Sequence, residues 1–156
     1  MLDTITFGLA FAAYVLVCAR VVLYGCGRPG RPVSVAAAAL ALAHVGMVWG
    51  WRFQWSLDRA VEKGLAGFTV FHLALAGIVA AAIAPAPWAG RCSTAVFPVV
   101  TAGALGAVFR YDEVSLYRIP LVFAAGLTAL LMAWGLTSFS SRTCPPRARR
   151  RPSTID

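Results

Sequence analysis

Residues 33–51, VSVAAAALALAHVGMVWGW, decide the fold of this chain. The stretch is apolar over almost its whole length, and about 20 such residues form a helix that crosses the ~30 Å hydrocarbon core of a bilayer. His44 and Met47 lie within it, three residues apart, so they share one helix face. An ionisable side chain at membrane depth is costly and marks a candidate functional site.

Four further apolar blocks lie on either side of this stretch, separated by polar or Pro/Gly-rich loops. The sequence therefore predicts an all-α fold, an integral membrane bundle of five transmembrane helices within residues 1–140. The fourth block is short and contains Pro98. A span of this kind is expected to be kinked, to tilt little or to thin the bilayer locally. Pro- and Arg-rich residues 141–156 are expected to form a disordered, basic cytoplasmic tail. The predicted spans are about 4–24, 33–51, 64–84, 94–109 and 116–139.

Composition excludes a soluble domain. The 156 residues are 60% hydrophobic and 13% charged, about half the charged fraction of a typical soluble domain. A net charge of +8 would suggest nucleic acid in a soluble protein, but here the basic residues lie in loops and in the tail. We therefore expect a lipid bilayer as the partner and no nucleic acid. The first block lacks a basic start and is expected to be retained as a span rather than removed as a signal peptide.

The distribution of basic residues predicts the orientation. With the N-terminus outside and the C-terminus in the cytoplasm, most of the arginines fall on the inner side, as the positive-inside rule requires. The cysteines fall on the same side and form no CxxC pair, as expected for reduced cytosolic thiols. We expect a multi-pass protein of the cell (plasma) membrane. The inner basic residues are Arg20, Arg28, Arg31, Arg91, Arg142, Arg147, Arg149, Arg150 and Arg151.

The two histidines of the chain both lie inside predicted spans. At 1.5 Å per residue, His44 and His72 lie about 16 and 18 Å from the inner surface, which is the same depth. A short loop joins their spans, so these spans are expected to be antiparallel neighbours. Imidazole and thioether are soft donors that suit copper, especially Cu(I). The predicted metal site is therefore His44, Met47 and His72.

Three other interpretations of the histidines remain open. The first is a structural role, with hydrogen bonds to a backbone carbonyl or to a hydroxyl such as that of Thr69 or Thr101. His and Met are also axial ligands of haem b, although neighbouring antiparallel helices give a haem little room. The third interpretation is that the histidines handle protons or a substrate. The sequence places no carboxylate inside a span that could continue a proton relay.

Catalytic signatures are missing from the sequence. There is no HExxH, GxSxG or phosphate-binding loop. Asp112 and Glu113 are adjacent, so their side chains diverge and make a poor acid–base pair. We therefore expect a protein that is not an enzyme. Small residues, such as the GxxxG pair Gly46–Gly50, let helices approach closely, and they raise a second hypothesis, an accessory subunit of a larger membrane complex.

At the AHVGM motif, the chain resembles a family of small uncharacterised actinobacterial membrane proteins, which have about five spans and a His-x-x-Met in the second. The resemblance in the layout of the spans covers the whole chain. The resemblance in motif covers only His44 and Met47. It implies a link to copper and adds no catalytic residue. The chain has no further methionines around the motif.

Overall fold

The computed structural model describes residues 2–62 and 64–140, and this part of the chain is helical, with no strand. The predicted tail, 141–156, lies outside the described residues. Five of the helices are long and apolar enough to cross a membrane, which confirms the predicted helical class and the five candidate spans. The long helices are α1 (Leu2–Gly25), α2 (Arg31–Met47), α4 (Leu65–Ile83), α5 (Ala86–Arg110) and α6 (Arg118–Ser140), and the short elements are η1 (Val48–Arg52), α3 (Leu57–Val61) and η2 (Asp112–Tyr117).

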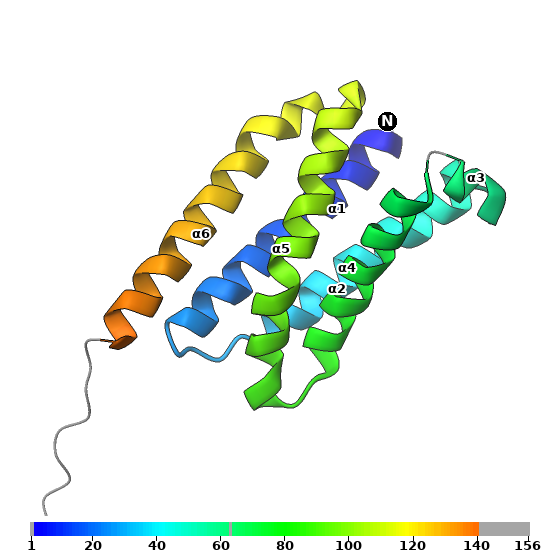
Figure 1. Ribbon diagram of the computed structural model, residues 1–156. Helices are drawn as coiled ribbons and strands as arrows, with labels where there is room; N and C mark the ends of the chain where they lie inside the picture. The colour runs from blue at the N-terminus through cyan, green and yellow to red at the C-terminus, as the bar shows by residue number, and fades with distance from the viewer. Residues whose placement is uncertain (1, 63, 141–156) are drawn as a thin grey trace, which may run out of the picture.

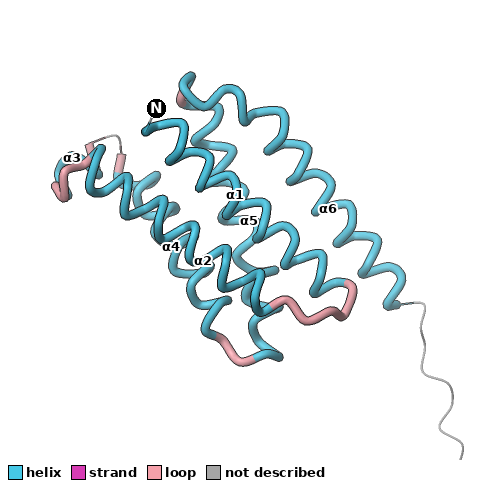
Figure 2. The backbone as a smooth tube through the Cα atoms, turned by 180° about the vertical axis from the view of Figure 1, so that it is seen from behind, coloured by secondary structure: helices cyan, strands magenta, loops and turns pink. Residues whose placement is uncertain are grey.

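The long helices form one bundle in which α1 is central (Figure 1). Helix α1 packs against α2, α5 and α6, and α4 packs against both α2 and α5. The N-terminus, α3 and the α5–α6 connection lie at one end, here called the N-terminal end. The α1–α2 and α4–α5 connections lie at the opposite end, as the view from behind also shows (Figure 2).

The fourth long helix differs from its prediction. It begins at Ala86 rather than at 94, so residues 86–91 belong to the helix and do not break it. Pro85 caps the helix, and a second proline stands in the first turn, where a missing N–H costs nothing. The helix also continues through Pro98, which is exposed. With 25 residues, α5 is long enough to span a bilayer.

Small side chains and satisfied hydroxyls fill the interior. Ala37, Ala38 and Ala41 present the buried face of α2, and the hydroxyl of Tyr14 on α1 bonds to that of Thr101 on α5 at 3.1 Å. The hydroxyls of Ser93, Thr94 and Thr128 donate to carbonyls one turn back in their own helices, which satisfies them within the bundle. The outer surface is apolar. On α6 and the turn before it, Leu116 and Ile119 are 81% and 83% exposed.

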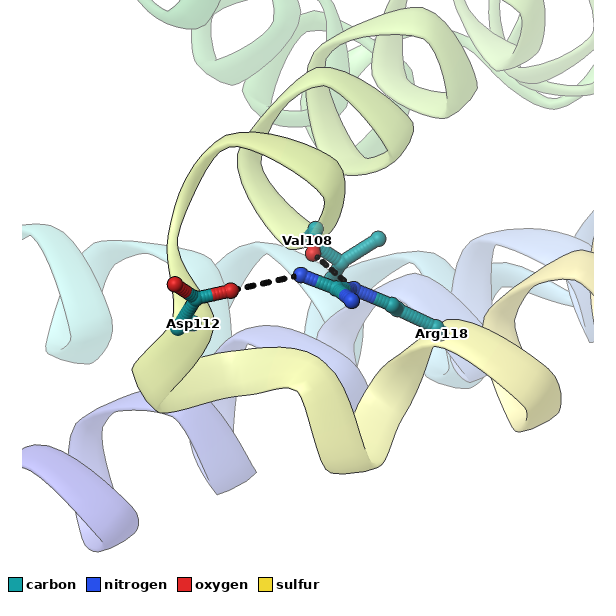
Figure 3. A network of polar contacts seen from close by, with 3 residues as sticks. All are labelled: Val108, Asp112 and Arg118. Atoms are coloured by element: carbon teal, nitrogen blue, oxygen red, sulfur yellow. Dashed lines mark hydrogen bonds and ion pairs between the residues drawn. The ribbon is translucent and has the colours of Figure 1, made fainter.

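The connection between α5 and α6 is held by one arginine (Figure 3). Arg118 donates from Nε to the carbonyl of Val108 at 2.8 Å, one of the carbonyls that the end of α5 leaves without a helical partner. The same guanidinium pairs with Asp112 at 3.1 Å. These contacts fix the end of α5 against the start of α6.

Helix α2 continues as a π-helical turn, η1, directly after Met47. The N–H of Phe53 reaches the carbonyl of Val48, five residues back. The chain then reverses through Gln54 and Trp55, both in the left-handed region with φ of 50° and 59°, a conformation that costs about 1–3 kcal/mol per non-glycine residue. The stacking of Trp55 on Trp49, with ring centroids 6.4 Å apart, helps to hold this reversal. Strained turns and π-helical segments cluster at functional sites.

Candidate functional site

A cavity of about 620 Å³ opens between α1, α2, α4 and α5 at the N-terminal end of the bundle. This volume lies within the range of small-molecule sites, roughly 300–1,000 Å³. Aromatic rings and glycines make up much of the wall, and two arginines, two histidines and a tyrosine are its ionisable members. The lining includes His44, Met47, Trp49, Arg52, Phe71, His72, Arg110 and Tyr111.

His44 is anchored to the neighbouring helix. Its Nδ1 lies 2.8 Å from the backbone carbonyl oxygen of Thr6 on α1. A carbonyl can only accept, so Nδ1 carries the proton of this bond. The neutral ring then keeps a lone pair on Nε2, which is the atom left to bind a proton donor or a metal ion.

His72 is anchored within its own helix. Its Nδ1 lies 2.8 Å from the carbonyl oxygen of Phe68, one turn back on α4, so the same reasoning leaves Nε2 as the binding atom. Three aromatic rings surround the imidazole, those of Phe68, Phe71 and Trp49, with centroids 4.0, 5.3 and 6.1 Å away. His72 therefore lies in a largely aromatic environment.

The three predicted ligands, His44, Met47 and His72, all line this cavity. The ring of Phe71 contacts both imidazoles, at 6.2 Å from His44 and 5.3 Å from His72. The hydroxyls that were considered as partners of the histidines are engaged elsewhere. Thr69 bonds to the carbonyl of Leu65, and Thr101 bonds to Tyr14.

Each imidazole therefore makes the backbone-carbonyl bond that a structural histidine would make, and the same bond is typical of histidines that bind metals. In the described residues, no three His, Cys, Asp or Glu side chains form a metal-binding group. Any metal ion held there would rely on the thioether of Met47 as well as on the imidazoles.

Two arginines and a tyrosine form the polar part of the cavity wall. The guanidinium carbons of Arg52 and Arg110 lie 5.7 and 6.0 Å from the centroid of the Tyr111 ring, within cation–π range. Both cations line the cavity. The site thus combines an apolar aromatic interior with positive charge from the ends of η1 and α5.

Sequence reasoning missed the aromatic part of this site. A tryptophan near the end of a span is usually found at the membrane interface, but the π-helical turn places Trp49 in the cavity wall against His72. Phe71 and His72 follow Phe68 by three and four residues, which places them on one face of a helix. This spacing was the available signal for an aromatic cluster around the histidine. The carbonyl of Thr6 carries no sequence signal, because every residue has one.

Comparison with family models, with curated proteins and with solved structures finds no match for this chain.

Proposed function

We propose that this chain is a non-enzymatic multi-pass membrane protein that binds copper(I) in the cavity, through His44, Met47 and His72. The observation that carries the proposal is that these side chains line one cavity while each histidine commits Nδ1 to a backbone carbonyl. Both Nε2 lone pairs then remain for a ligand. A second-shell carbonyl fixes the tautomer and raises the basicity of a metal-binding imidazole.

The orientation belongs to the same proposal. The bundle crosses the plasma membrane with the N-terminus outside and the C-terminus in the cytoplasm. Support comes from the sequence, in which nine of the 14 basic residues belong to the segments assigned to the inner side and to the tail. In this orientation the cavity lies in the outer half of the bundle, so copper enters it from outside.

Haem b is the second candidate, favoured by the size and lining of the cavity. A single ion needs far less than about 620 Å³, whereas a planar apolar ring system fills such a space between aromatic side chains. Arg52 and Arg110 suit the carboxylates that such a molecule carries. His44 and His72 come from two different helices, α2 and α4, and each offers Nε2 as an axial ligand.

Purification in detergent with metal analysis and an absorption spectrum separates these proposals. For copper, we expect the wild type to bind one copper(I) per chain, and His44→Ala or His72→Ala to lose it. Thr69→Val is the matched control, because this α4 hydroxyl bonds only its own helix in the described structure, and it should bind copper normally.

A Soret band that disappears in either histidine variant would overturn the copper assignment in favour of haem. A preparation that binds neither, and that co-purifies with another membrane protein, would overturn both and support the accessory-subunit hypothesis.

A further inference from the structure

A buried arginine lies far from the aromatic cavity, at the opposite end of the bundle. Arg20 on α1 is only 5% exposed. It packs so closely against the start of α2 that a β-carbon on Gly30 would come within 2.8 Å of its Cδ. Its guanidinium lies 5.8 Å from the centroid of the Tyr24 ring. An arginine side chain keeps its charge under all conditions that a protein tolerates, so a full positive charge lies inside the bundle.

The hydrogen bonds of Arg20 are incomplete. Its Nε donates to the hydroxyl of Ser34 at 3.1 Å, but its buried Nη1 has no hydrogen-bond partner in the described part of the chain. Buried charges are normally both paired and hydrogen-bonded. The unsatisfied nitrogen therefore points to a group that residues 2–62 and 64–140 do not supply.

No described carboxylate compensates this charge. The acidic residues within 2–62 and 64–140 all belong to segments at the N-terminal end, namely Asp3, Asp58, Glu62, Asp112 and Glu113. A neutral water molecule would satisfy the hydrogen bond but would leave the charge uncompensated.

The space beside Arg20 sets the size of its partner. A small cavity of about 10 Å³ is lined by Arg20 together with Ser34 and Ser93, which are 3% and 5% exposed. Such a volume is about that of one water molecule. A chloride ion is larger than a water molecule, so the side chains of Arg20 and Ser93 would have to move apart to admit it, whereas phosphate, sulfate and carboxylates would need a much larger opening. The Ser93 hydroxyl now donates to the carbonyl of Ala89 and can rotate toward an anion.

We propose that Arg20, Ser34 and Ser93 form a binding site for a single chloride ion between α1, α2 and α5. The guanidinium supplies the charge and the free Nη1 donor, and the Ser93 hydroxyl supplies a second donor from another helix. Chloride binding would then tie these helices together at this end of the bundle. This site is independent of the proposed copper function, because it shares no residue with the aromatic cavity.

The test compares the thermal unfolding of the purified protein in chloride and in gluconate, at constant ionic strength. Gluconate is too large for the cavity. A ligand at ten times its Kd should raise the unfolding midpoint of the wild type by about 3–5 °C. Arg20→Gln should show no chloride dependence.

Ser93→Ala keeps the test valid if Arg20→Gln fails to fold, and it should weaken the chloride dependence several-fold. Thr94→Val is the matched control, because the Thr94 hydroxyl makes the same bond one turn back in α5 but does not line the small cavity. It should respond to chloride as the wild type does. Line broadening of ³⁵Cl in nuclear magnetic resonance gives a direct measure of binding, and it should be present in the wild type and reduced in Ser93→Ala.

Equal midpoints of the wild type in chloride and gluconate, without ³⁵Cl broadening, would show that the cavity holds water only and would overturn the proposal. An equal response of Ser93→Ala and Thr94→Val would also overturn it, since chloride would then act elsewhere.

Discussion

Replacement of Gly77 by alanine tests how closely α4 and α5 pack. A β-carbon on Gly77 would overlap Cγ2 of Val96 on α5 and would lie 3.0 Å from Cγ1 and 3.2 Å from Cβ of the same side chain. Valine has one strongly preferred rotamer in a helix, and rotation cannot move its Cβ. The two helices must therefore separate, or Val96 must leave its rotamer.

The expected cost follows from two opposing effects. Overpacking of this kind costs about 1–3 kcal/mol, and replacing a helical glycine by alanine regains up to about 1 kcal/mol. Gly77→Ala should therefore lower the free energy of unfolding by about 1–2 kcal/mol, which corresponds to a fall of about 3–6 °C in the unfolding midpoint. The measurement is thermal unfolding of the purified protein in detergent, followed by circular dichroism.

Gly67→Ala is the matched control on the same helix, because a β-carbon there meets nothing within 4 Å. It should leave the midpoint unchanged or raise it slightly. The double variant Gly77→Ala/Val96→Ala should be less destabilised than the two single changes predict, since the new methyl group fills the space left by Val96. Equal midpoints for Gly77→Ala and Gly67→Ala would refute the close packing of α4 on α5.

Three further predictions concern other contacts. Arg118→Met removes the hydrogen bond to the Val108 carbonyl and should destabilise the fold by about 1 kcal/mol. Thermal unfolding should show this as a lower midpoint. An unchanged midpoint would show that the α5–α6 connection does not depend on this hydrogen bond. Tyr14→Phe leaves the Thr101 hydroxyl without its partner and should cost about 1–2 kcal/mol, whereas Tyr14→Phe combined with Thr101→Val should cost little more than either change alone. Cys26 is exposed and should react with a membrane-impermeant maleimide in inverted vesicles but not in intact cells, and labelling of intact cells would contradict the proposed orientation.

The sequence by itself determined the helical class and the number of candidate spans. Long apolar blocks cannot remain in water, and a backbone in lipid must bond to itself, so helices are the outcome that composition and length impose. The ends of α1, α2 and α4 lie within a few residues of the predicted 4–24, 33–51 and 64–84. The start of α5 was misjudged, because a proline near a helix end can either break the helix or begin it, and only the surrounding chain selects between them.

Only the tertiary structure decided which glycines bring helices together. The GxxxG pair Gly46–Gly50 suggested close packing, yet a β-carbon on Gly46 would meet nothing within 4 Å, whereas Gly77 and Gly90 lie directly against Val96 and Tyr24. The rotation of each helix about its axis settles this, and in a chain rich in small residues many rotations satisfy the same pattern.

For the same reason, the sequence predicts some features of the candidate site, whereas helix packing decides the others. Depth along each span follows from residue count, and on that basis His44 and His72 were predicted to lie at one level, with Met47 one turn away on the helix face of His44. Their common cavity, the carbonyl of Thr6 that orients His44 and the aromatic rings around His72 depend on how neighbouring helices face one another. The buried charge of Arg20 is likewise invisible in the sequence, where it reads as one more basic residue at the end of a span. Helix packing places it inside the bundle rather than at the lipid surface.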